Sequence, residues 1–149
     1  TGWSIAPRKF MTAAHCVDIP QLRLTMDDGR VGLVASFTRH PTGMDIALLV
    51  IPGLDCPCAV VPADRAVRNE LAYTVGYPFG IANILTIGEI QGRVTADDGR
   101  VYLLATAMVA PGNSGGGLFV VRDGLAWLVG IVVVMVGTNH ISGSVEVIP

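Results

Sequence analysis

The feature that most constrains the fold is the lack of any helix-length segment with an apolar residue at every third or fourth position. Hydrophobic residues make up 51% of the 149 positions, and they fall in short runs separated by turn formers. Alternation with period two is typical of half-buried β-strands, whereas an amphipathic helix repeats every 3.6 residues. With 18 glycines and 9 prolines to supply turns, the sequence predicts an all-β fold. Single helical turns are expected only after His15 and around 65–70.

Several segments show the strand pattern directly. Residues 3–6 and 10–12 are short apolar runs on either side of a polar turn, and residues 21–25 alternate between polar and apolar side chains. Residues 31–37 are expected to return as the partner of 21–25. In the second half of the chain, the expected strands are 71–75, 83–95, 101–107, 117–121, 126–136 and 144–148. The most apolar run, 125–136, has twelve residues, short of the roughly 20 that a membrane helix needs, so it predicts one or two buried strands.

One tetrapeptide occurs twice. Asp27-Asp28-Gly29-Arg30 recurs as Asp97-Asp98-Gly99-Arg100, and each copy is followed by a β-rich run. The favoured interpretation is two hairpins that need the same Asp-Gly turn. A second interpretation is that the two halves are related barrels. Calcium binding by the paired aspartates is a third, but no spaced ligand loop accompanies them.

The segment 110–117 places Ser114 among four glycines, directly ahead of an apolar run. Glycines allow a loop to aim backbone N–H groups at one point, and a serine beside two such donors suits acyl transfer. A serine hydroxyl alone is a weak nucleophile, so this chemistry also needs a base and a group that orients the base. His15 and Asp45 lie upstream and are the candidates.

These three residues stand in recognisable surroundings: Thr12-Ala13-Ala14-His15-Cys16, Asp45-Ile46-Ala47-Leu48-Leu49 and Gly112-Asn113-Ser114-Gly115-Gly116. In this order the segments resemble the chymotrypsin-like (trypsin-fold) serine proteases. Their spacing, and the segment Gly76-Tyr77-Pro78-Phe79-Gly80, look most like the compact bacterial Deg (high-temperature-requirement) branch. The resemblance covers almost the whole chain.

The resemblance implies two six-stranded Greek-key β-barrels within a single domain, 1–149. The expected boundaries are 1–51 for the first barrel, 52–70 for a crossing segment and 71–149 for the second barrel. Since the sequence starts at Thr1, the first barrel is expected to be N-terminally truncated. The same resemblance implies an extracytoplasmic or secreted location.

The resemblance also implies the chemistry. Ser114 would attack a peptide carbonyl, His15 would take and return the proton, Asp45 would orient the imidazole, and an acyl-enzyme would form. The backbone N–H groups of Gly112 and Ser114 would form the oxyanion hole. This reaction needs a polypeptide substrate and no cofactor.

Substrate choice is predicted by position within the family pattern. Met108, six residues before the nucleophile, would lie at the base of the primary specificity pocket, and the run Ile131, Val132, Val133 and Val134 would supply a wall. Neither offers a charge to pair with a charged substrate side chain. We therefore expect cleavage after small or medium aliphatic residues. Asn113, which is uncharged, cannot form the ion pair that activates the digestive relatives, so loops, oligomer contacts or accessory domains would shape the site.

Two alternatives remain open at this point. The chain could be a protease-fold domain that only binds, although none of the three site residues is substituted. Ser114, Asp123 and His140 follow the order of an α/β-hydrolase esterase, but the alternating βαβ pattern of that fold is lacking. His40 and His140 are interpreted as loop histidines.

The net charge and the cysteines bear on which other partners and metal ions the chain is expected to bind. The net charge of −2 gives no indication of nucleic-acid binding or of binding to an acidic membrane surface, and we expect no membrane insertion by this segment.

Cys16, Cys56 and Cys58 cannot all pair internally, and they lack matching ligands for zinc, so no metal site is predicted. By the resemblance, Cys16 would pair with a cysteine upstream of Thr1; the residues alone favour buried thiols.

Overall fold

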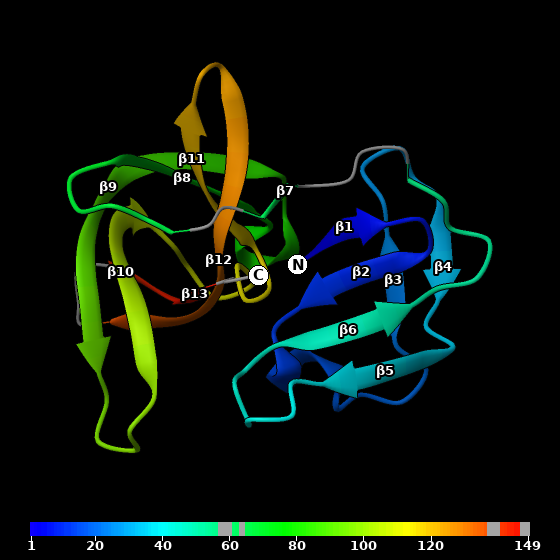
Figure 1. The fold of residues 1–149 in the computed structure, drawn as a ribbon. Coiled ribbons are helices and arrows are strands. Elements are labelled where there is room, and N and C mark those ends of the chain that lie inside the picture. The colour runs from blue at the N-terminus through cyan, green and yellow to red at the C-terminus, as the bar shows by residue number, and fades with distance from the viewer. Residues whose placement is uncertain (57–60, 63–64, 137–140, 147–149) are drawn as a thin grey trace.

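The computed structural model describes residues 1–56, 61–62, 65–136 and 141–146. It contains two β-sheet lobes side by side, the first built from β1–β6 and the second from β8–β13 (Figure 1). Besides strands, the described residues form two 3-10 turns, η1 (Ala14–Val17) and η2 (Pro78–Gly80). The all-β prediction is therefore confirmed. No helix among the described residues is long and apolar enough to cross a membrane.

The first lobe consists of two antiparallel sheets around one apolar core. Its strands are β1 (Gly2–Ala6), β2 (Lys9–Thr12), β3 (Arg23–Thr25), β4 (Val31–Leu33), β5 (Ser36–Arg39) and β6 (Ala47–Val50). The larger sheet has the order β1-β2-β6-β5, and β3 pairs with β4. Alternating residues point inward, so Phe10, Leu49 and Ile51 are almost completely buried and pack together.

The second lobe is a closed barrel. Its strands are β8 (Leu71–Gly76), β9 (Ile84–Thr95), β10 (Val101–Met108), β11 (Gly117–Arg122), β12 (Leu125–Val136) and β13 (Ile141–Glu146). Because β11 pairs with both β8 and β12, the order β11-β8-β9-β10-β13-β12 returns to its start. The interior is filled by side chains such as Ile90, Leu103 and Leu118. The short strand β7 (Val61–Pro62) lies between the lobes in sequence and pairs parallel to β12.

The two Asp-Asp-Gly-Arg segments form the same turn. The N–H groups of Gly29 and Gly99 each donate to the carbonyl three residues earlier at 2.9 Å, and both glycines have a positive φ, +85° and +81°. In each copy the arginine N–H also donates to the second aspartate at 3.0 Å. This is a type I turn closed by a left-handed glycine, a common three-residue hairpin connection. The favoured interpretation, one turn used twice, agrees with this geometry.

Two local predictions differ from the structure. The expected strand 31–37 is two strands, β4 and β5, because the chain changes partner between them: the Val34 N–H donates to Leu22 O and the Ala35 N–H donates to Val50 O. The run 125–136, for which one or two strands were expected, is one continuous strand. The bounds of β13 are 141–146 rather than 144–148, of which 147–148 lie outside the described residues.

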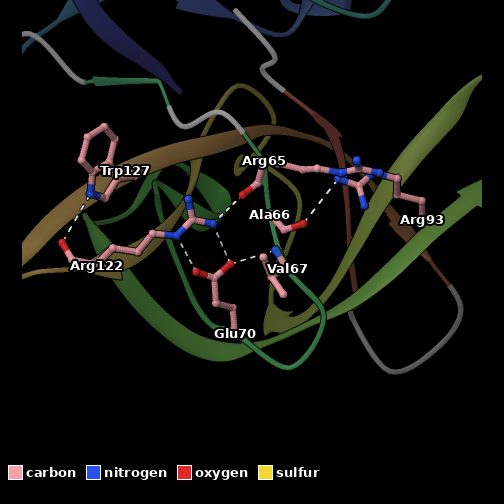
Figure 2. Close-up of polar contacts among 7 residues, drawn as sticks. All are labelled: Arg65, Ala66, Val67, Glu70, Arg93, Arg122 and Trp127. Atoms are coloured by element: carbon pink, nitrogen blue, oxygen red, sulfur yellow. Dashed lines mark hydrogen bonds and ion pairs between the residues drawn. The ribbon is translucent and has the colours of Figure 1, made fainter.

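The helical turn predicted at 65–70 is also wrong, and a side-chain network explains the difference (Figure 2). The Glu70 carboxylate accepts the Val67 N–H at 2.8 Å and binds the Arg122 guanidinium through two contacts of 2.6 and 3.0 Å. Arg122 also donates to the Arg65 carbonyl, and Trp127 donates to the Arg122 carbonyl at 3.4 Å. The Glu70 N–H also donates to Val67 O at 3.2 Å, but this single turn does not continue as a helix, and the contacts with Arg122 of β11 hold the segment in place.

The lobes share a third core. Ala13 and Ile46 from the first lobe pack with Phe119, Leu128, Ile131 and Val133 from the second. Trp3 of β1 reaches across and meets the Phe119 ring edge-on, with 4.8 Å between ring centroids. Because Ala13 and Ile46 are sequence neighbours of two of the three candidate catalytic residues, this shared core sets where those residues lie.

Candidate active site

His15 and Asp45 form a polar pair joined by two contacts. The turn η1 carries His15, and Asp45 immediately precedes Ile46 and the buried strand β6. Asp45 Oδ2 lies 2.6 Å from His15 Nδ1, and Asp45 Oδ1 accepts the backbone N–H of His15 at 2.8 Å. One carboxylate thus fixes both the position and the ring orientation of the histidine. The second ring nitrogen, Nε2, is on the opposite side of the imidazole from this contact.

Asp45 is held by a compact loop. The His40 N–H donates to Ile46 O at 2.9 Å, and the Gly43 N–H donates to His40 O at 3.0 Å. The His40 ring lies 2.8 Å from the Thr42 hydroxyl. His40 therefore lies in a loop, as predicted, and its contacts shape the segment that leads to Asp45.

Ser114 lies on a loop that is attached to β12. The Gly115 N–H donates to Val132 O at 2.7 Å, and the Val132 N–H donates to Gly116 O at 2.8 Å. On the other side of the serine, its carbonyl oxygen lies 3.9 Å from Cys16 Sγ, beside His15. The structure thus brings the Ser114 loop against the turn that carries His15. Within the described part of the chain, the Ser114 hydroxyl forms no hydrogen bond.

Two backbone donors of this loop are unused. Among the hydrogen bonds of the described residues, none is donated by the N–H of Gly112 or of Ser114. Gly112 has φ +100°, and a Cβ there would lie 2.4 Å from Tyr77 O. Only glycine fits this backbone, because any side chain would be strained and would also clash.

Asn113 is buried with an unpaired side-chain oxygen. Its exposed fraction is 4%, and among the described residues its Oδ1 has no hydrogen-bond partner. The side chain packs against the backbone of Gly76. An ionised aspartate at this position would be a buried charge without a partner, which is far more costly than a buried amide.

The residues predicted to bind substrate lie in different surroundings. Met108 ends β10 and is 61% exposed, and its carbonyl accepts the Thr86 hydroxyl at 2.7 Å. Ile131 and Val133 are buried in the core shared by the lobes. Val132 is 3% exposed, and its backbone holds the Ser114 loop. Val134 pairs with Gly143 in the sheet, and its side chain lies outside the described set.

The hydrolase alternative does not fit the fold. Asp123 occupies the turn between β11 and β12, at the end of β11 that is far from Ser114. His140 lies outside the described residues. The barrel around Ser114 is antiparallel, whereas an α/β-hydrolase requires a mostly parallel sheet flanked by helices.

No group of three or more potential metal ligands gathers among the described residues. A cavity of about 970 Å³ lies between the lobes, lined mainly by apolar side chains that include Trp3, Tyr73 and Phe119. His15, Asp45 and Ser114 do not line it. The cavity is therefore separate from the candidate catalytic residues.

Of the cysteines, Cys16 is a thiol beside the candidate site, and Cys58 is outside the described residues.

Contacts around 77–83 were not indicated by the sequence. The Phe79 N–H donates to the Pro111 carbonyl at 2.6 Å, directly before Gly112. The Tyr77 hydroxyl donates to Asp27 Oδ1, and the Asn83 amide donates to Asp27 Oδ2 at 3.0 Å. Asp27 belongs to the hairpin turn of the first lobe. The only sequence signal in this region is the Gly76–Gly80 segment, which marks the family resemblance and does not predict these partners.

Comparisons with known proteins agree with this arrangement. The family model described as trypsin-like peptidase domain matches residues 1–131. The protein HhoB of Synechocystis sp., described as a serine protease, is 32% identical over 119 residues, which are 74% of this chain and 28% of HhoB. The chain thus spans about a quarter of that relative's length.

Two solved structures share the fold. The HtrA-type protease AlgW, in a structure with a decapeptide, has a TM-score of 0.82 and 22% identity over 97% of this chain and 47% of AlgW. An inactive serine-to-alanine variant of Rv3671c from M. tuberculosis has a TM-score of 0.80 and 22% identity over 97% of this chain and 74% of its own. Because the family model covers most of the sequence and the lobes reproduce this fold, the chain belongs to the trypsin-like peptidase domain family.

Proposed function

We propose that this domain is a serine endopeptidase that uses Ser114, His15 and Asp45. The observation that carries the proposal is the double contact of Asp45 with His15, through Nδ1 and through the backbone N–H. An imidazole held at Nδ1 presents Nε2 as a base, which is the arrangement needed to activate a serine hydroxyl. Family membership supports the same roles.

The proposed reaction proceeds in two halves. Ser114 Oγ forms a bond with the substrate carbonyl carbon while its proton moves to His15. His15 then gives that proton to the departing amine as the C–N bond breaks, which leaves an acyl-enzyme. Water repeats the sequence: it loses a proton to His15, attacks the ester carbonyl and releases the acid and the serine hydroxyl. Asp45 stabilises the imidazolium in both halves.

The oxyanion is assigned to the N–H groups of Gly112 and Ser114. Their support is that both donors are unused among the described residues and lie in one tight loop. One such donor is typically worth about 2.7–4 kcal/mol in the transition state. A donor already held in place needs no rearrangement when the charge develops.

The proposed substrate is a polypeptide with an aliphatic residue before the cleaved bond. Met108, with its exposed side chain, is assigned to the substrate side, whereas the side chains of Ile131, Val132 and Val133 are buried, so the run 131–134 is assigned only a backbone role there. These side chains offer no charge, so a charged substrate residue would be desolvated without a partner. Cleavage of a peptide library should favour Val, Ala or Leu, and Met108→Asp should shift selection toward Lys and Arg. Strong selection for Lys, Arg or Glu by the unmodified protein would refute this assignment.

A fluorophosphonate probe tests the proposed nucleophile. Ser114 Oγ would bond to phosphorus, fluoride would leave, and His15 would take the proton. We expect labelling of the unmodified protein, complete loss in Ser114→Ala, and full retention in the control Ser36→Ala, whose serine is exposed on β5. Folded protein that remains unlabelled would instead favour the binding-only alternative.

Activation is proposed to depend on loops and contacts around the site. The buried, uncharged Asn113 cannot form an ion pair with a newly cut amine. A requirement for a defined free N-terminus in contact with Asn113 would contradict this proposal.

A further inference from the structure

The segment 77–83 connects the two lobes at the proposed oxyanion hole. At one end it contacts the loop before Ser114, and at the other it holds a carboxylate of the first lobe. From these contacts we propose that Asp27 is a positioning residue for the oxyanion hole and acts through Tyr77 and Asn83. This inference rests on the proposed function and adds to it a residue that lies outside the catalytic constellation.

The first step concerns one peptide unit. Pro111 C=O and Gly112 N–H belong to the same planar trans peptide, so they point in opposite directions. The Phe79 N–H binds that carbonyl at 2.6 Å, and this contact turns the Gly112 N–H the other way. Rotation of this peptide would remove the donor from the hole. Gly112 has φ +100° and no side chain, so its own residue type does little to prevent that rotation.

The second step concerns what holds Phe79. Its backbone is left-handed, with φ +54°, and its side chain is 68% exposed. A bulky residue seldom adopts this conformation, and an exposed ring gives little packing to maintain it. Within the turn η2, the Gly80 N–H donates to Tyr77 O at 3.0 Å and the Ile81 N–H donates to Pro78 O at 3.2 Å, so the position of Phe79 follows that of the residues on either side of it.

The third step identifies these neighbours. Tyr77 and Asn83 lie on either side of Phe79, and both donate to Asp27, one to each carboxylate oxygen. The Tyr77 N–H also donates to the Thr1 hydroxyl at 3.1 Å, and that hydroxyl donates to Gly112 O at 2.9 Å. Hydrogen bonds to a carboxylate are stronger than those between neutral groups. Asp27 thus holds both ends of the segment in which Phe79 orients the oxyanion-hole peptide.

The chain contains its own matched control. Asp97 has the same place in the second copy of the Asp-Asp-Gly-Arg turn, and among the described residues it forms no side-chain hydrogen bond or ion pair. Asp97→Ala therefore changes the same turn chemistry without affecting the segment 77–83. All these aspartates are exposed, so neither substitution should cost much stability.

The test is the second-order rate of fluorophosphonate labelling, together with kcat and KM for a peptide substrate. Removing an oxyanion donor costs roughly 10²–10³ in kcat, so loosening one should slow labelling and lower kcat about tenfold in Asp27→Ala, with little change in KM. Asp97→Ala should stay within about twofold of the unmodified protein, and both variants should unfold at similar temperatures. A merely structural role would not produce this selective loss of kcat.

Two further variants test the route. Asn83→Asp places a second carboxylate beside Asp27 and should be as slow as Asp27→Ala. The double variant Asp27→Asn, Asn83→Asp restores an amide–carboxylate pair in which the amide is at position 27 and the carboxylate is at position 83. It should recover most of the labelling rate. In a double-mutant cycle, Tyr77→Phe should change the labelling rate little when residue 27 is already alanine. The reason is that substitutions at two residues that act through each other do not have additive effects.

The outcomes are distinguishable. If the unmodified protein is not labelled, the proposed function fails. If it is labelled but folded Asp27→Ala reacts within about twofold of it, or if the swapped pair gives no recovery, the positioning role of Asp27 is refuted and the proposed function stands.

Discussion

At the scale of single residues, Asp45 directs both of its carboxylate oxygens to His15, one to the ring and one to the backbone. In Asp45→Asn only one of the two side-chain atoms can accept, and the amide nitrogen must donate. The imidazole would then be held in the wrong tautomer or the wrong position. We expect kcat to fall by roughly 10⁴ while the unfolding temperature is nearly unchanged. Asp55→Asn, at an exposed position, is the control; unchanged activity in Asp45→Asn would remove Asp45 from the mechanism.

Cys16 gives a prediction about pH. Burial raises the pKa of its thiol above the ordinary value. Because folding raises this pKa, the neutral thiol contributes to the free energy of unfolding. That contribution is fully present below the pKa of the unfolded state and is lost as the pH rises through the pKa of the folded state. In urea titrations between neutral and alkaline pH, the stability of the unmodified protein should therefore fall more steeply than that of Cys16→Ala. Parallel curves for the two proteins would show that the thiol does not contribute.

The candidate site could be read from the sequence only where a local motif marks it. His15, Asp45 and Ser114 each stand in a short recognisable segment, and the structure brings the first two into contact and the third close by. The link from Asp27 to Tyr77 and Asn83 joins residues far apart in sequence that belong to no common motif. Such contacts depend on how the lobes meet, which side-chain periodicity does not encode.

At the scale of elements, the Glu70–Arg122 pair holds the segment 65–70 to β11 (Figure 2). Lysine cannot reproduce the two-pronged contact of the guanidinium. Arg122→Lys should lower the free energy of unfolding by about 1–3 kcal/mol, because both side chains are partly buried and would be left incompletely paired. Arg8→Lys should change it by less than about 1 kcal/mol, since Arg8 and its partner Asp55 are exposed. Urea denaturation measures both; equal effects would show that burial of the first pair is unimportant.

The elements themselves were predictable where turn residues or the length of an apolar run mark the ends of a strand. The hairpin β1–β2 and the long strand β12 follow from alternation, turn residues and apolar length. The break between β4 and β5 was missed because residues 31–37 form one continuous pattern in sequence, while the Val34 and Ala35 N–H groups bond to different neighbours. The segment 65–70 was misread as helical because its shape depends on Arg122, which is 52 positions from Glu70.

At the scale of the whole molecule, the two lobes share a core and should unfold together. Phe119 is central to that core and meets Trp3 of the first lobe. Phe119→Ala should lower stability by about 3–5 kcal/mol. In proteins that retain Phe119, Trp127→Phe leaves Trp3 as the only tryptophan and Trp3→Phe leaves Trp127. The fluorescence of both proteins should report the same unfolding transition. Transitions at clearly different denaturant concentrations would show that the lobes are independent.

The division of the candidate catalytic residues between the lobes has a consequence for biosynthesis. His15 and Asp45 leave the ribosome early, but the Ser114 loop is closed only when Val132 of β12 is available to bond Gly115 and Gly116. A chain that is still being synthesised therefore lacks both the shared core that sets where His15 and Asp45 lie and the shaped Ser114 loop. The proposed proteolytic activity can arise only after the second barrel has been made and has closed, so the unfinished chain cannot digest itself or its neighbours during translation.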